Sequence, residues 1–173
     1  MTFGLYDKYK DQIKTGDLIE FKTPGIISTL IRIRTGKDVN HTAIALRLTN
    51  YDNERLFIGE ATEDGFVPTI LRHKLEKVDY TRAYWVPLRD EYEEYRHEIG
   101  KCLLTLIGRR PPYDYWALFT QLFGHTPLSP KKLFCSETVH CINKNIGIAQ
   151  RDNAPWPGEF ENTKLYGARQ RIF

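Results

Sequence analysis

The spacing of apolar and polar positions in the first part of the chain predicts one strand followed by one helix. Residues 16–21 read GDLIEF, in which apolar and charged positions alternate as in a short strand entered from a turn. Residues 24–34 read PGIISTLIRIR, whose apolar positions have helical spacing and whose proline suits a first turn. We expect Gly36 to end this helix.

Four further segments have the pattern of strands. Residues 41–48 and 56–61 flank the turn residues of 50–53, so we expect them to form a hairpin. Residues 65–71 and 83–88 are predicted to add two more strands. Together with the first strand, they predict a sheet of about five strands.

The second part of the chain is predicted to be mostly helical. Residues 91–107 have the pattern of a long amphipathic helix, and 113–123 that of a short aromatic helix. Residues 133–145 have the pattern of a third helix, ended by Gly147, and we expect the last 26 residues to be mostly irregular. Helices packed outside a sheet imply an α+β fold.

Composition places the chain among ordinary globular proteins. A length of 173 residues suits one domain, and 41% apolar with 27% charged residues is usual for a water-soluble protein. No apolar run reaches the length of a membrane span, and charges interrupt the first 16 residues, so neither a transmembrane helix nor a signal peptide is expected. We therefore expect a cytoplasmic protein, and an origin in a phage or virus stays open.

The charge pattern gives little support to nucleic-acid binding. The net charge is only +3, and the basic residues lie in scattered pairs rather than on one element. We therefore expect no nucleic-acid partner.

The three cysteines, at positions 102, 135 and 141, are expected to be reduced thiols. Their number is odd, and no secretory signal is visible. The chain has no C-x-x-C motif, and His140 directly precedes Cys141, so a zinc site is not expected and neither is another cofactor. Cys102 and Cys141 are expected to be structural.

Cys135 begins an apolar stripe near the start of a predicted helix. Val139, Ile142 and Ile146 follow it at +4, +7 and +11, so all four residues lie on one helix face. The exposed N–H groups and the dipole at a helix start favour a thiolate, which is the nucleophilic form of cysteine. The alternative is a buried cysteine that acts as a small hydrophobic residue, which is the commonest role of a free cysteine.

His41 is the histidine best placed to partner such a thiol. It shares one strand face with Ala43 and Ala45, and these small neighbours predict a groove beside the imidazole. The other face carries apolar residues at 44, 46 and 48, which we expect to be the core side. The alternative is a histidine at a strand edge that bonds only a backbone carbonyl.

Glu60 can supply a carboxylate beside His41. A hairpin that turns within 50–53 places either Glu60 or Thr62 opposite His41, depending on its register. In both registers the carboxylate is close enough to orient the imidazole, as the third member of a catalytic triad does. The alternative is an exposed carboxylate at the edge of the sheet.

The order of these motifs resembles the circularly permuted branch of the papain-like NlpC-type amidases, in particular its YiiX/YebB-like group. The resemblance spans roughly residues 15 to 160. It rests on the segments GDLI (16–19), HTAIA (41–45), GEA (59–61), GFV (65–67), YDY (113–115), FCSE (134–137) and WPGEF (156–160). As in the permuted group, the histidine precedes the cysteine.

The resemblance implies a single permuted papain-like domain over residues 1–173, with an antiparallel sheet of about five strands packed with helices. It implies that Cys135 is the nucleophile, His41 the base and Glu60 the group that orients it. Tyr113 matches a tyrosine often found near the site in these proteins and is expected to bind substrate or to line the oxyanion pocket. The expected reaction is cleavage of an amide bond in a peptide or amino-acid conjugate, such as a murein peptide, through a thioester and without a cofactor.

Two other functions stay open at this point. A lipid thioesterase or acyltransferase of the same fold is the first, although the acyltransferase branch resembles Asn-Cys-Glu-His at the nucleophile and uses a second histidine. This chain has FCSE at 134–137 and Glu60 instead, which favours hydrolysis. The second is a non-catalytic binding or virion structural module that kept the fold. The oligomeric state is left open by the sequence.

Overall fold

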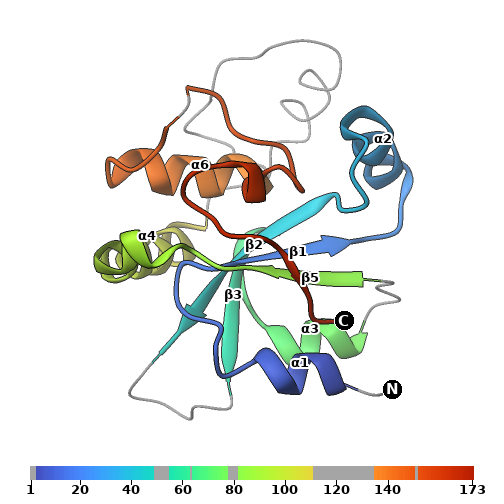
Figure 1. Cartoon of the computed structure of the whole chain (residues 1–173), viewed down its shortest axis with the longest axis horizontal. Coiled ribbons are helices and arrows are strands. Elements are labelled where there is room, and N and C mark those ends of the chain that lie inside the picture. The colour runs from blue at the N-terminus through green and yellow to red at the C-terminus, as the bar shows by residue number, and fades with distance from the viewer. Residues whose placement is uncertain (1–2, 49–54, 63, 78–81, 111–134, 151) are drawn as a thin grey trace.

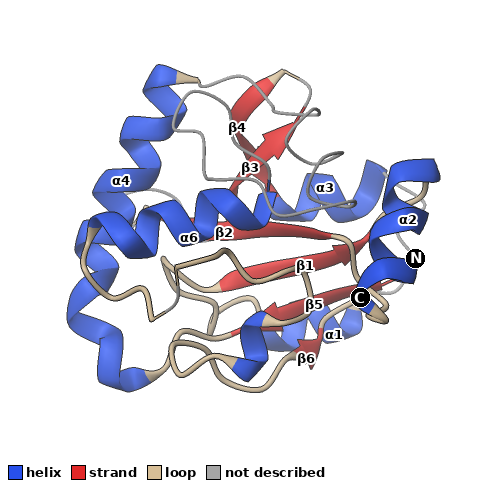
Figure 2. Cartoon of the chain, turned by 90° about the horizontal axis from the view of Figure 1, so that it is seen from above, coloured by secondary structure: helices blue, strands red, loops and turns tan. Residues whose placement is uncertain are grey.

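The structure is a computed structural model of the whole chain, described except at residues 1–2, 49–54, 63, 78–81, 111–134 and 151. It is a mixed α+β fold built on one antiparallel sheet (Figure 2). The strand order is β4-β3-β2-β1-β5-β6. The strands are β1 (Leu18–Lys22), β2 (His41–Arg47), β3 (Leu56–Thr62), β4 (Gly65–Ile70), β5 (Arg82–Val86) and β6 (Gln170–Arg171).

The five predicted strands are confirmed, and the predicted hairpin pairs β2 with β3. The sixth strand, β6, lies in the C-terminal segment that was expected to be irregular. It has only two residues and pairs with β5, so it was too short to show an alternating pattern.

Five α-helices and two 3₁₀ turns are described around the sheet (Figure 1). They are α1 (Gly4–Tyr9), α2 (Ile26–Thr35), α3 (Leu71–Lys77), η1 (Asp90–Tyr95), α4 (Arg96–Arg109), α6 (Cys135–Asn145) and η2 (Phe160–Asn162). As predicted, α2 ends at Gly36, whose φ of 66° is the left-handed conformation of a helix cap. The predicted aromatic helix at 113–123 lies outside the described residues. No helix among the described residues is long and apolar enough to cross a bilayer.

The helix predicted over 91–107 is divided in two. Its first turn is the 3₁₀ turn η1, in which Tyr92 departs from helical geometry with φ −113°. The α-helix α4 begins only at Arg96 and continues beyond Gly108 to Arg109. Apolar spacing alone does not separate a 3₁₀ turn from the α-helix that follows it.

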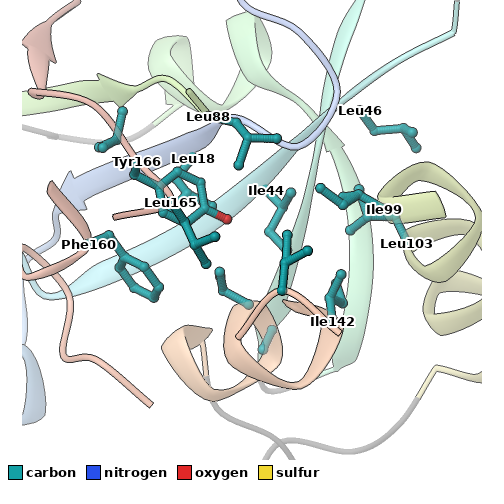
Figure 3. Packing of buried hydrophobic residues seen from close by; sticks show 14 of the residues in the cluster. Leu18, Ile44, Leu46, Leu88, Ile99, Leu103, Ile142, Phe160, Leu165 and Tyr166 are labelled. Carbon is teal, nitrogen blue, oxygen red and sulfur yellow. The ribbon is translucent and has the colours of Figure 1, made fainter. Parts of the chain in front are cut away.

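Both faces of the sheet are covered. Ile44 points toward α6, and Leu18 and Leu46 pack in the same cluster with Ile99 and Leu103 of α4 (Figure 3). The helices α1 and α3 cover the other side of the sheet (Figure 1). Their buried residues form a second hydrophobic cluster with that face of the strands. The prediction of a single core face was therefore wrong.

The second core also removes the groove that was predicted beside His41. Ala43 and Ala45 are 1% and 0% exposed, and they pack in one cluster with Ile19 and Ile58. Their small side chains allow close packing of α1 and α3 on this face instead of leaving space for a substrate.

Asp17 ties the central strand to its surroundings. It is 1% exposed, and its carboxylate accepts hydrogen bonds from Trp85 Nε1 at 2.8 Å and from the backbone N–H of Leu88 at 3.0 Å. It also accepts one from Arg96 Nη1 at 2.7 Å and one from the backbone N–H of Lys14 at 2.9 Å. These bonds compensate the cost of burying the charge, so Asp17 joins β1, β5 and α4 and stabilises the fold.

Candidate active site

Cys135 is the first described residue of α6, which agrees with its predicted place in or near the first turns of this helix. Val139 and Ile142 are 1% and 3% exposed and pack in one cluster with Ile44 of β2, which holds the helix against the sheet. Ile146 is partly buried against the same cluster. The stripe therefore fixes the position of Cys135, which is itself 4% exposed.

His41 is the first residue of β2 and is paired with Phe21 of β1. Its Nε2 lies 3.0 Å from Oε2 of Glu60. Burial lowers the pKa of His41, but hydrogen bonds and charge interactions with Cys135 and Glu60 outweigh it and raise the pKa to about 9. The imidazole is thus brought together with both predicted partners, one from α6 and one from β3.

Glu60 is a buried carboxylate in an internal strand. In the observed register Ile44 pairs with Gly59, so Glu60 lies one step nearer the His41 end of β2 and on the same face as His41. This is the register that places Thr62, rather than Glu60, level with His41. Glu60 is 1% exposed, so the alternative of a surface carboxylate does not hold.

The charge of Glu60 is stabilised by two cations. Burial raises its pKa, but the hydrogen bond and charge of His41 and the ammonium of Lys74 lower it to about 2. Nζ of Lys74 lies 2.9 Å from Oε1 and 2.7 Å from Oε2. Glu60 is therefore ionised at neutral pH and holds a fixed position between α3 and β2.

Lys74 is the residue of this cluster that sequence reasoning missed. It lies on α3, a seven-residue helix that was not predicted. A signal was present, because Leu71 and Leu75 are spaced by one helical turn and both are 0% exposed. Two apolar residues are too few to distinguish a short helix from the end of the preceding strand.

The other thiols lack these partners. Burial first, and then the charge of Glu137, raises the pKa of Cys141 to about 11, so its thiol is protonated at neutral pH. Cys102 is half-buried in α4 and accepts a hydrogen bond from Nδ2 of Asn145 at 3.4 Å. Tyr113, the predicted substrate-binding residue, lies outside the described residues.

Glu20 is a second buried carboxylate, on β1 beside the strand of His41, and it was not expected to matter. It is 0% exposed, and burial raises its pKa to about 7 although Oε1 accepts a hydrogen bond of 2.8 Å from the N–H of Gly158. Gly158 has φ 83° and belongs to the WPGEF segment of the resemblance. Glu20 thereby holds this C-terminal segment against the sheet.

A cavity of about 220 Å³ lies between the second half of α6 and the C-terminal segment. Its lining includes His140, Asn143, Phe160 and Tyr166. His140 is 3% exposed, and burial lowers its pKa. His140 lines this cavity together with Phe160 and Tyr166 of the C-terminal segment.

Comparisons with known proteins support the fold. No family model matches the chain, and no curated protein matches its sequence. The chain is similar to the crystal structure of the metalloprotein YiiX (DUF1105) from Escherichia coli O157:H7, with a TM-score of 0.67. The two chains are 15% identical, and the match covers 92% of this chain and 97% of the other. The chain therefore has a YiiX-like fold.

Proposed function

We propose that the chain is a single-domain cysteine hydrolase of the circularly permuted, papain-like NlpC type, which cleaves an amide bond in a peptide or amino-acid conjugate. The observation that carries this proposal is the contact of His41 with both Glu60 and Cys135. A purely structural cysteine has no need of a charged histidine beside it. The YiiX-like fold and the permuted order of His41 and Cys135 agree with the proposal.

The reaction begins with a thiolate and an imidazolium. A His41 pKa of about 9 means that about a hundred imidazoles are protonated for each neutral one at pH 7. The proton can come from Cys135, which leaves a nucleophilic thiolate at the positive end of α6. Glu60 stabilises the imidazolium and fixes the orientation of its ring.

Acylation and hydrolysis then follow in two steps. The sulfur of Cys135 attacks the amide carbonyl, and backbone N–H groups at the start of α6 stabilise the oxyanion. As the C–N bond breaks, His41 donates its proton to the leaving amine, and a thioester remains. Neutral His41 then takes a proton from water, the resulting hydroxide attacks the thioester, and the proton returns to the departing sulfur.

A resident metal does not fit this cluster. YiiX is described as a metalloprotein, but the described residues of this chain contain no group of three His, Cys, Asp or Glu side chains placed to hold an ion. Both oxygens of Glu60 already contact the ammonium of Lys74, and Oε2 also contacts His41. The ammonium group of Lys74 thus occupies the position beside Glu60 that a metal ion would need.

The proposed substrate is a short peptide of the murein type, with free charged termini. The test is to incubate the purified protein with muropeptides and, separately, with long-chain acyl esters and phospholipids, each beside Cys135→Ala. We expect peptide cleavage that is lost in Cys135→Ala. Cys135-dependent deacylation of lipids without peptide cleavage would indicate the thioesterase or acyltransferase instead. Absence of Cys135-dependent turnover of every substrate would indicate the non-catalytic module.

A further inference from the structure

We propose that Lys74 is a positioning residue of this site, which fixes the carboxylate of Glu60 and limits how firmly that carboxylate retains the proton of His41. The part of the inference that concerns catalysis rests on the proposed function. The part that concerns the charge of His41 does not, because it follows from the contacts of the three side chains.

The position of Lys74 is set by the fold. Glu60 of β3 pairs with Val67 of β4, and α3 follows β4 directly in the chain. Leu71 and Leu75, both 0% exposed, anchor α3 in the core. Lys74 lies between them in sequence, and its side chain is only 18% exposed. The ammonium is therefore held at Glu60 by packing of the helix as well as by its charge.

The ammonium group of Lys74 fixes the orientation of the Glu60 carboxylate. Nζ reaches both oxygens, at 2.9 and 2.7 Å, so the carboxylate is held at two points. Oε2 also contacts His41 Nε2 at 3.0 Å, which means that two cations share this oxygen when His41 is protonated. With its carboxylate held in this way, Glu60 presents one defined oxygen to the imidazole.

The positive charge of Lys74 also affects the protonation of His41. The titratable groups described in contact with it are Cys135 from α6 and Glu60 from β3. Lys74 acts on it through Glu60, because the ammonium offsets part of the negative charge that stabilises the imidazolium. Lys74 thereby makes His41 a stronger acid, better able to donate its proton to the leaving amine.

The test measures the titration of His41 directly, by NMR of ¹³C-labelled imidazoles from pH 6 to 11. We expect Lys74→Gln to raise the pKa of His41 by on the order of one pH unit, because the removed positive charge no longer opposes protonation. Lys74→Arg keeps the positive charge, so His41 of this variant should titrate as it does in the parent. Lys74→Met removes the charge at similar side-chain length and repeats the test if Lys74→Gln does not fold.

The matched control is Arg72→Gln on the same helix. It also removes one positive charge from α3, but the partner of Arg72 is the exposed Glu76, at 3.2 Å. Equal His41 titrations in the parent, Arg72→Gln and the uncharged Lys74 variants would overturn the inference.

A second measurement separates this inference from the proposed function. In an active enzyme, Lys74→Gln should move the alkaline limb of the pH–rate profile upward with the titration of His41, and kcat should fall more than KM changes. If the titration of His41 shifts but no substrate is turned over, the effect of Lys74 on His41 holds and the proposed function is refuted. Cys135-dependent turnover with an unshifted titration would retain the function and refute the role of Lys74.

Discussion

Replacement of Glu60 by Gln should destabilise the protein in a way that depends on pH. The substitution keeps the shape of the side chain but removes the negative charge between His41 and Lys74. Glutamine therefore resembles the protonated form of Glu60. Below about pH 5, where imidazoles are largely protonated, the difference in stability between parent and variant should follow the ionisation of Glu60.

The size of the effect follows from the pKa of Glu60. A pKa lowered from 4.5 to about 2 corresponds to about 3 kcal/mol of native-state stabilisation. The folded pKa is depressed, so this contribution is fully present above pH 4.5 and is lost as the pH falls through 2. The same relation leaves about 1.5 kcal/mol at pH 3. Any constant cost of fitting glutamine into the site adds equally at each pH.

Urea unfolding followed by circular dichroism at pH 7, 5, 4 and 3 measures this difference. We expect the stability gap between parent and Glu60→Gln to shrink by about half between pH 5 and pH 3. Glu76→Gln is the matched control, because Glu76 forms an exposed pair with Arg72 on α3, and it should remain close to the parent. A gap for Glu60→Gln that stays the same from pH 5 to 3 would refute the reasoning.

Two further substitutions test the scaffold of the site. Asp17→Ala leaves Arg96 and the indole N–H of Trp85 without their buried acceptor, and we expect urea unfolding to show a loss of about 3–5 kcal/mol. Gly158→Ala places a Cβ 2.9 Å from Cγ2 of Val39 at a φ of 83°, so it should lower the thermal midpoint and cost more than about 1 kcal/mol. A parent-like midpoint would show that the C-terminal segment can move away from the sheet.

The sequence was sufficient to predict the parts of the site that have a regular period. The +4 and +7 spacing after Cys135 correctly predicted a helix packed on the sheet. The hairpin argument brought Glu60 within reach of His41, although it left two registers open. In each case a buried apolar face restricts the alternatives, because a slip of one residue would expose it.

The features that were missed depend on contacts between distant segments. Lys74 contacts Glu60 only because the short helix α3 packs against the sheet. No local sequence pattern predicts this contact. The apolar character of Ala43 and Ala45 suited a groove and a second core equally, and the covering by α1 and α3 decided between them. Burial raises the pKa of Glu20 to about 7, and the segment that contacts it is more than a hundred residues away in the chain.

The role of His41 can be tested through the reactivity of Cys135. Brief treatment with iodoacetamide at pH 6 to 7, mapped by mass spectrometry, compares the three thiols within one molecule. Cys141 is an internal reference, because burial raises its pKa to about 11 and keeps it in the unreactive thiol form. His41→Ala removes the proposed partner of the thiolate without touching any cysteine.

The most direct test of the proposed pair is the alkylation rate of Cys135 in the parent and in His41→Ala. The account predicts that Cys135 is labelled first of the three cysteines in the folded parent, and that His41→Ala slows its labelling at least tenfold at pH 6 to 7. Preferential labelling of Cys102 or Cys141, or a Cys135 rate that does not change in folded His41→Ala, would contradict it.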